Sequence, residues 1–422
     1  MRSFDCEHVY AICLLKALGR LVGYILKQRN KMGEIRADQA VFGVFHHFEL
    51  GRELYQRNLL GKLYSTFPWA RLKREGLPHD KVDTFPWIHG PEMLLWRAGI
   101  PTWVTDGADY FNSLLFDEWT ARRVHDCDAF IAISGAGLKT GGLVQKRGGK
   151  FICDRGSTHQ RYQERVVTDE HRLWGVDTEV SDPRDTLREE KIYDLADAIT
   201  VPSTFAQRSF IESGVPEHKI HVIPYGVNLS NFAKVSGPAK DTFEVLFVGA
   251  VALRKGVPYL LEAFSQIKHP AKRLRVVGAM SPCMKQVLNR LPQEKVEFVG
   301  PLPQSSIAKV MSSSHVLVLP SIEDGFGLVM SQALACGCPV ISSTNTGGQD
   351  LFTDGEEGFV VPIRDVGALK ECMERLADDP ELQRRMSEAA LRRAKRLGGW
   401  TQYGSLWESL LRRLTLSQPI GT

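Results

Sequence analysis

The sequence lacks the features that mark nucleic-acid-binding, disordered and membrane-embedded proteins. Its 422 residues carry a net charge of only +4, which is too small to indicate a nucleic-acid partner. Apolar residues make up 43% of the chain and charged residues 24%, values close to the average of soluble globular proteins. At this length the chain is expected to form two domains, each with its own core.

Neither the cysteine spacing nor the N-terminal sequence indicates a zinc site or a secreted protein. The eight cysteines form no CxxC pair, and Cys336 and Cys338 stand too close together for the usual zinc spacing. Residues 1–38 lack the layout of a secretory signal peptide, because no small-residue cleavage site follows an apolar core. We therefore expect a reduced cytoplasmic protein without a metal site.

One N-terminal segment, Ala11 to Lys27, has apolar residues at helical spacing. Lys16 and Arg20 interrupt it, so it would be a poor membrane-spanning helix. Two interpretations stay open. It is either a membrane-surface helix, which would place the protein peripherally at the inner face of the membrane, or a helical extension packed on the protein.

Short β-branched runs alternate with longer helical patterns along the whole chain, which is typical of α/β proteins with parallel sheets. A Pro-, Gly-, Asn- and Ser-rich stretch, Ile223 to Phe243, separates two such series. The pattern predicts four parts: a helical extension (1–38), a first α/β unit (39–225), a second (226–397) and a C-terminal helix (398–422) that packs back on the first unit.

The stretch SIEDGFGLVMSQALACGCPVIS, Ser321 to Ser342, indicates a binding site in the second unit. Its acidic pair follows a buried strand, where open parallel sheets bind their ligands. The turn that follows would let a ligand approach the backbone, and the helix after it would offer free N–H groups to an anion. The candidate residues are Glu323, Asp324, Gly325, Phe326, Gly327, Leu328, Val329 and, one and a half turns into the helix, Gln332. An ordinary strand-to-helix turn is the open alternative.

Other candidates follow strands elsewhere. Arg254 and Lys255 come after the strand Glu244 to Ala250, and a guanidinium beside an ammonium suits a diphosphate. In the first unit, His159 follows the strand Lys150 to Asp154, and His46 and His47 follow a run expected to be a strand, Ala40 to Phe45. A histidine at such a place is either structural or catalytic, and the sequence leaves both readings open.

Familiar nucleotide motifs do not explain these residues. The run Ile133 to Leu143 has Thr140 where a dinucleotide-binding loop needs its third glycine, and no Walker GK[ST] sequence occurs.

Four segments resemble glycosyltransferase family 4: Asp197 to Asn228, Val245 to Phe264, Val316 to Phe352 and Asp354 to Asp365. They occur in the family's order and spacing. The N-terminal stretches TFPW, LKREGLP and CDRGSTHQRYQ resemble a bacterial subgroup of that family. Where the family motif has two glutamates separated by seven residues, this chain has Asp324 and Gln332, and Glu323 stands one residue earlier. Ala250 occupies a place where many relatives have arginine.

The resemblance implies the GT-B fold, two Rossmann-like domains that face a cleft. It also implies a retaining glycosyltransferase that moves a sugar from a nucleoside diphosphate to an acceptor hydroxyl, with no cofactor besides the donor. Asp324 or Glu323 would contact the donor sugar together with His159. Arg254, Lys255 and the amides from Gly327 to Val329 would hold the diphosphate, and Gln332 the ribose. His46 and His47 would lie on the acceptor side. A glycan or lipid-linked acceptor in cell-surface polysaccharide or glycolipid biosynthesis is expected.

Two alternatives to this function remain. A nonhydrolysing sugar-nucleotide epimerase of the same fold would need paired acids for elimination, and the EDGFG segment argues against it. A relative without turnover, acting as a partner subunit or nucleotide-sensing module, is the other alternative because both glutamate places of the motif are altered.

Overall fold

The computed structural model describes residues 35–88, 102–177 and 182–416. The segment Ala11 to Lys27 and most of the expected extension 1–38 lie outside the described residues. Within them, no helix combines the length and apolar character needed to cross a membrane.

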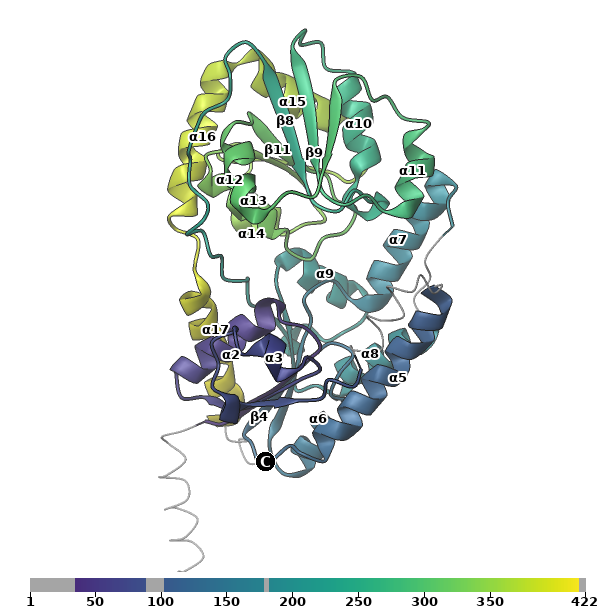
Figure 1. The fold of residues 1–422 in the computed structure, drawn as a ribbon, viewed down its shortest axis with the longest axis vertical. Helices are drawn as coiled ribbons and strands as arrows, with labels where there is room; N and C mark the ends of the chain where they lie inside the picture. Colours follow the sequence, from purple (N-terminus) through teal and green to yellow (C-terminus); the bar gives the residue numbers. More distant parts are fainter. Residues whose placement is uncertain (1–34, 89–101, 178–181, 417–422) are drawn as a thin grey trace, which may run out of the picture.

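The described chain folds into two α/β units stacked along the long axis of the molecule (Figure 1). Every strand pair in both sheets is parallel. The first sheet has the order β3-β2-β1-β4-β5-β6-β7, and the second has the order β10-β9-β8-β11-β12-β13. The predicted fold class, two parallel α/β units, is therefore confirmed.

The strands of the first sheet are β1 (Ala37–Val41), β2 (Leu60–Ser65), β3 (Val82–Thr84), β4 (Ala129–Ile133), β5 (Lys150–Asp154), β6 (Ala198–Val201) and β7 (Ile220–Val222). Those of the second are β8 (Phe243–Val248), β9 (Lys272–Val277), β10 (Val296–Gly300), β11 (Val316–Leu319), β12 (Val340–Ser343) and β13 (Gly358–Val361).

Helices cover the faces of both sheets. In the first unit they are α2 (Phe45–Gln56), α3 (Trp69–Leu72), α5 (Thr102–Ala121), α6 (Leu138–Lys146), α7 (Gln160–Trp174), α8 (Pro183–Leu195) and α9 (Thr204–Glu212), with 3₁₀ turns η1 (His79–Lys81) and η2 (Glu217–Lys219). In the second they are α10 (Val257–Ser265), α11 (Pro282–Leu288), α12 (Gln304–Ser312), α13 (Leu328–Ala335), α14 (Gly348–Leu351), α15 (Val366–Asp378) and α16 (Pro380–Ala394), with η3 (Leu253–Lys255); α17 (Trp400–Leu416) follows.

The first strand lies earlier in the sequence than predicted. We expected it over 40–45, but β1 is Ala37–Val41, and helix α2 already begins at Phe45. The reason is Asp38, a charged residue that is fully buried because its carboxylate accepts hydrogen bonds from the Lys62 amide and the Tyr64 hydroxyl. A buried and satisfied carboxylate does not show in an apolar pattern.

Helix α17 leaves the second unit and lies against α2 of the first (Figure 1). Arg57, the residue after α2, donates to the Thr401 carbonyl at 2.7 Å and forms an ion pair with Glu408 at 3.3 Å. Trp407, Leu410 and Leu411 are buried on the same helix. The two units are thus joined twice by the chain, at residues 223–242 and at the start of α17.

Candidate active site

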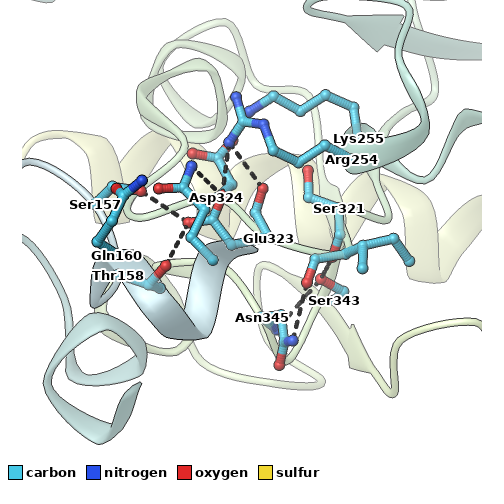
Figure 2. Close-up of polar contacts among 12 residues, drawn as sticks. Ser157, Thr158, Gln160, Arg254, Lys255, Ser321, Glu323, Asp324, Ser343 and Asn345 are labelled. Carbon is cyan, nitrogen blue, oxygen red and sulfur yellow. Dashed lines mark hydrogen bonds and ion pairs between the residues drawn. The ribbon is translucent and has the colours of Figure 1, made fainter. Parts of the chain in front are cut away.

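The loop between β11 and α13 carries the acidic pair and lies between the two units (Figure 2). A neighbouring loop, between β12 and α14, holds it in place. The Asn345 amide donates to the Ile322 carbonyl at 2.9 Å, and the Asp324 N–H donates to the Asn345 carbonyl at 3.0 Å. Both loops follow the carboxyl ends of adjacent parallel strands, which is why they meet at one sheet edge.

Glu323 is buried between the units and is saturated with hydrogen bonds (Figure 2). Ser157 and Thr158 of the first unit donate to its Oε1 at 2.8 and 2.9 Å. Gln163 of the first unit donates to Oε2 at 3.3 Å. From its own unit, Arg254 pairs with Oε2 at 2.8 Å. Glu323 therefore joins the two units, and its carboxylate has little capacity left for a ligand.

Asp324 points to the other side of the loop, into a cavity of about 310 Å³ between the units. The Lys255 ammonium lies 2.6 Å from its Oδ2, and both side chains are mostly buried. Burial by itself would disfavour the charged carboxylate, but the Lys255 charge and hydrogen bond hold the pKa of Asp324 below its ordinary value. The pair therefore presents one anionic and one cationic group to the same space.

The start of α13 completes this cavity on the side of the second unit. Phe326, Gly327, Leu328 and Val329 line it together with Gly249 and Ala250, at the end of β8. Gly327 has φ of 77° and begins the helix, a conformation that favours glycine. The first N–H groups of a helix have no partner within it and carry a partial positive charge, so an anion can bind there.

Gly325 contacts the first unit instead of the cavity. Its carbonyl accepts from Ser203 at 2.6 Å, and a Cβ at this position would lie 2.7 Å from the Cα of Ser157. The loop can approach the first unit this closely because residue 325 has no side chain. The first unit contributes Gly156 and Tyr225 to the cavity wall.

Arg254 and Lys255 do not share one cavity. Arg254 lines a separate cavity of about 500 Å³ along α7, while Lys255 lines the one that contains Asp324. The two residues belong to the 3₁₀ turn η3, in which successive side chains point about 120° apart. The Nη1 of Arg254 also donates hydrogen bonds to the carboxylate and the backbone carbonyl of Glu323.

His159 lies inside the first unit and lines neither of these two cavities. It precedes α7, and its ring packs 4.9 Å from Tyr193 and 5.1 Å from Phe210, centroid to centroid. Burial lowers the pKa of His159 to about 4, so the ring is neutral at pH 7. This placement differs from the one expected beside the donor sugar, because the aromatic side chains of α8 and α9 enclose the ring.

His46 and His47 lie together at the start of α2, and both face Asp154 at the end of β5. Their Nε2 atoms are 3.2 and 3.4 Å from the same Asp154 oxygen, Oδ2. Burial, reinforced by the His46 charge, lowers the pKa of His47 to about 3. Burial also opposes ionisation of Asp154, but His46 and His47 hold the pKa of this carboxyl below its ordinary value.

The sequence analysis missed three residues at this edge: Asp154, Gly156 and Tyr225. Asp154 was the last residue of a predicted strand, and its position at the carboxyl end of β5 was the available signal. Tyr225 lies just after β7, at the end of the first unit, and no sequence pattern pointed to it. Gln332 lies on α13, partly buried, and does not line the cavity that contains Asp324.

Solved structures share this fold over nearly the whole chain. A sucrose-phosphate synthase from Thermosynechococcus elongatus superposes with a TM-score of 0.64 at 21% identity, covering 91% of this chain and 100% of that one. The Anabaena protein HepE, solved in complex with UDP, gives a TM-score of 0.63 at 16% identity, covering 90% and 99%.

Two family models match consecutive parts of the sequence. "Glycosyltransferase Family 4" matches residues 155–231, and "Glycosyl transferases group 1" matches residues 230–393. The chain has the GT-B fold, and the two glycosyltransferase models together match residues 155–393. The two matches contain the interdomain loops described above, including Lys255, Glu323 and Asp324.

Curated relatives of this chain include D-inositol 3-phosphate glycosyltransferases. A D-inositol 3-phosphate glycosyltransferase of Thermomonospora curvata is 28% identical over 257 residues, which are 54% of this chain and 58% of the relative. One of Corynebacterium urealyticum is 26% identical over 370 residues, 82% of this chain and 72% of that protein. The chain spans about half the length of the first curated relatives that it matches.

Proposed function

We propose that this GT-B chain transfers a sugar from a nucleoside diphosphate to an acceptor hydroxyl and retains the configuration of the anomeric carbon. The observation that carries the proposal is the cavity between the units. It combines the Lys255–Asp324 ion pair with the start of α13, and the first unit closes its other wall. A structural neighbour, the Anabaena protein HepE, has been solved with UDP-glucose, which supports a donor of this class.

In this proposal the donor diphosphate binds Lys255 and the N–H groups of Gly327 to Val329. Charge develops on the diphosphate as its bond to the sugar breaks, and prearranged positive groups lower the energy of that state. Asp324 accepts hydrogen bonds from the sugar hydroxyls and orients the anomeric carbon. The partner of Asp324 in the structure is Lys255, so both groups are already in place before a donor binds.

The reaction forms one bond and breaks one bond at the anomeric carbon. The acceptor oxygen attacks from the face that the diphosphate leaves, and its proton passes to a diphosphate oxygen. No side chain has to serve as the base in this scheme. We propose a glycan or lipid-linked acceptor that enters from the first unit, where Gly156 and Tyr225 line the cavity.

Nucleotide binding to the purified chain tests the proposal. UDP, GDP, ADP and CMP would each be titrated by calorimetry and thermal shift, since a ligand at 100 times its Kd adds about 2.7 kcal/mol of stability. Lys255→Ala should abolish the response to the preferred nucleotide and lower donor turnover by roughly 10²–10³. Lys285→Ala, which removes an exposed lysine of α11, is the matched control.

The result also separates an enzyme from a binding module. Nucleotide binding that depends on Lys255, together with hydrolysis or transfer of the matching donor sugar, supports the transferase. Binding without either reaction would favour the nucleotide-sensing module instead. Unchanged nucleotide binding and donor turnover in Lys255→Ala would contradict the role assigned to this residue.

A further inference from the structure

Three buried side chains converge at the cleft edge of the first sheet, and neither the fold nor the proposed transfer reaction uses them. They are His46 and His47, which follow β1 and begin α2, and Asp154, which ends β5. Each side chain is at most 5% exposed. Their potential ligand atoms, two imidazole nitrogens and one carboxylate oxygen, all lie within 4.8 Å of one another.

The distances suit a shared metal ion better than two direct hydrogen bonds. His46 Nε2 lies 3.2 Å from Asp154 Oδ2, a hydrogen bond at the long end of the usual range, whereas His47 Nε2 lies 3.4 Å from the same oxygen, beyond that range. Ligand atoms about 2.0–2.2 Å from a tetrahedral zinc ion are roughly 3.3–3.5 Å apart. The Nε2 of His47 is buried and accepts or donates no hydrogen bond within the described part of the chain.

The electrostatics point the same way. Within residues 35–88, 102–177 and 182–416, the ion-pair partners of Asp154 are these two histidines. Both rings must be neutral to bind a metal ion through Nε2, and the buried Asp154 carboxylate would then carry a negative charge that needs a cation, because burying an unpaired charge is costly. A divalent cation would balance this charge and give the buried Nε2 of His47 a partner.

The surroundings already orient the three groups as the outer contacts of a metal site usually do. Thr200 donates to the second carboxylate oxygen, Oδ1, at 2.8 Å and so leaves Oδ2 to face the histidines. The His46 ring contacts the rings of His47 and Tyr225 in tilted arrangements, at centroid distances of 3.7 and 4.3 Å. These contacts fix the direction of the imidazole and carboxylate groups.

We propose that His46, His47 and Asp154 bind one divalent transition-metal ion of the zinc class. Two imidazoles and a carboxylate are a common donor set for such ions. The ion would tie the start of α2 to the end of β5 directly behind the cavity wall. His46 contacts Tyr225, and a Cβ on Gly156 would lie 3.2 Å from the His46 ring. Tyr225 and Gly156, which line the cavity wall, therefore both pack against His46.

Cobalt binding tests this site without any glycosyl donor, so its outcome is independent of the proposed transfer reaction. The purified full chain would be treated with a chelator, dialysed and titrated with Co²⁺, whose visible absorption bands report tetrahedral nitrogen and oxygen ligands. We expect one equivalent of Co²⁺ per chain, displaced by Zn²⁺. His47→Gln and Asp154→Asn should each abolish the bands.

Two further variants keep the result interpretable. His218→Gln, which removes an exposed histidine of η2, should bind Co²⁺ like the parent chain. Thr200→Val keeps all three ligands and should weaken binding about 10–100-fold, because the carboxylate loses the contact that orients it. A folded parent chain without stoichiometric Co²⁺ binding, or unchanged binding in both His47→Gln and Asp154→Asn, would overturn the site.

Discussion

Arg364 of the second unit donates a 2.8 Å hydrogen bond to Glu170 of the first unit, whose side chain is completely buried. The second carboxylate oxygen of Glu170 accepts from the Trp174 indole at 2.9 Å. Helix α7, which carries Glu170 and Trp174, extends from the first unit towards α11 of the second (Figure 1). Together with Glu323, this pair holds the units in the arrangement that forms the cavity.

We expect the Glu170–Arg364 pair to couple the units energetically. In a double-mutant cycle of Glu170→Gln and Arg364→Gln, urea unfolding should give a coupling energy of about 1–3 kcal/mol. Arg364 has φ of 63°, and glutamine at this position keeps the same backbone cost, which therefore cancels in the cycle. The exposed Glu381–Arg384 pair on α16 is the control and should show no measurable coupling. Equal coupling in both pairs would contradict the interdomain role.

Loss of the carboxylate charge should lower mainly the stability at Glu323 and mainly the donor turnover at Asp324. Glu323→Gln leaves Arg254 without its carboxylate partner and turns an amide N–H towards groups that donate to Glu323 in the parent chain. The variant should therefore lose about 1–3 kcal/mol of stability. Nucleotide binding should stay intact. Asp324→Asn should change stability less but lower donor turnover roughly 10²-fold, because the sugar is no longer oriented. Urea unfolding and donor hydrolysis, measured on both variants, check this. The reverse pattern would make Glu323 the residue that contacts the sugar.

His159 gives a prediction about pH. Its pKa is lowered from 6.5 to about 4 by burial, so between these values the unfolded chain binds a proton that the folded chain does not. The stability contributed by the neutral ring is therefore complete above pH 6.5 and is lost as the pH falls towards 4, by at most about 1.4 kcal/mol per pH unit.

His159→Phe cannot titrate and should pack between Tyr193 and Phe210. We expect it to gain stability relative to the parent as the pH falls from 6.5 to 4, measured by urea unfolding at several pH values. Its donor turnover should stay close to that of the parent at pH 7.5. A folded His159→Phe variant without turnover would instead support the contact with the donor sugar that the family resemblance implies.

Gln332→Glu restores the carboxylate that the family motif has at this position. Because a carboxylate accepts hydrogen bonds from both hydroxyls of a diol, we expect nucleotide binding to be maintained or to become tighter. Calorimetry with the preferred nucleotide measures this. Loss of nucleotide binding in a correctly folded variant would contradict the ribose contact that the family resemblance implies for Gln332.

Much of the fold could be predicted because it depends on local patterns. The strand Lys150 to Asp154 was predicted with the bounds that the structure has, since a short apolar run after a glycine pair is a clear signal. The edge strands β3 and β7 have only three residues each, too few to give a clear alternating pattern, and the sequence analysis did not predict them. The first strand was placed too late because Asp38 is buried in it.

For the candidate site, the sequence alone identified the right loops, since in parallel sheets the segments after the strands meet at one edge. It could not decide which way each side chain points. Only the tertiary structure separates Glu323 from Asp324 and Arg254 from Lys255, because adjacent residues in a tight loop or a 3₁₀ turn face different surroundings. It alone also encloses His159 among aromatic rings and brings His46 and His47 to Asp154, more than 100 residues away. Sequence periodicity reports burial along one segment, whereas these contacts join segments that only the folded chain places side by side.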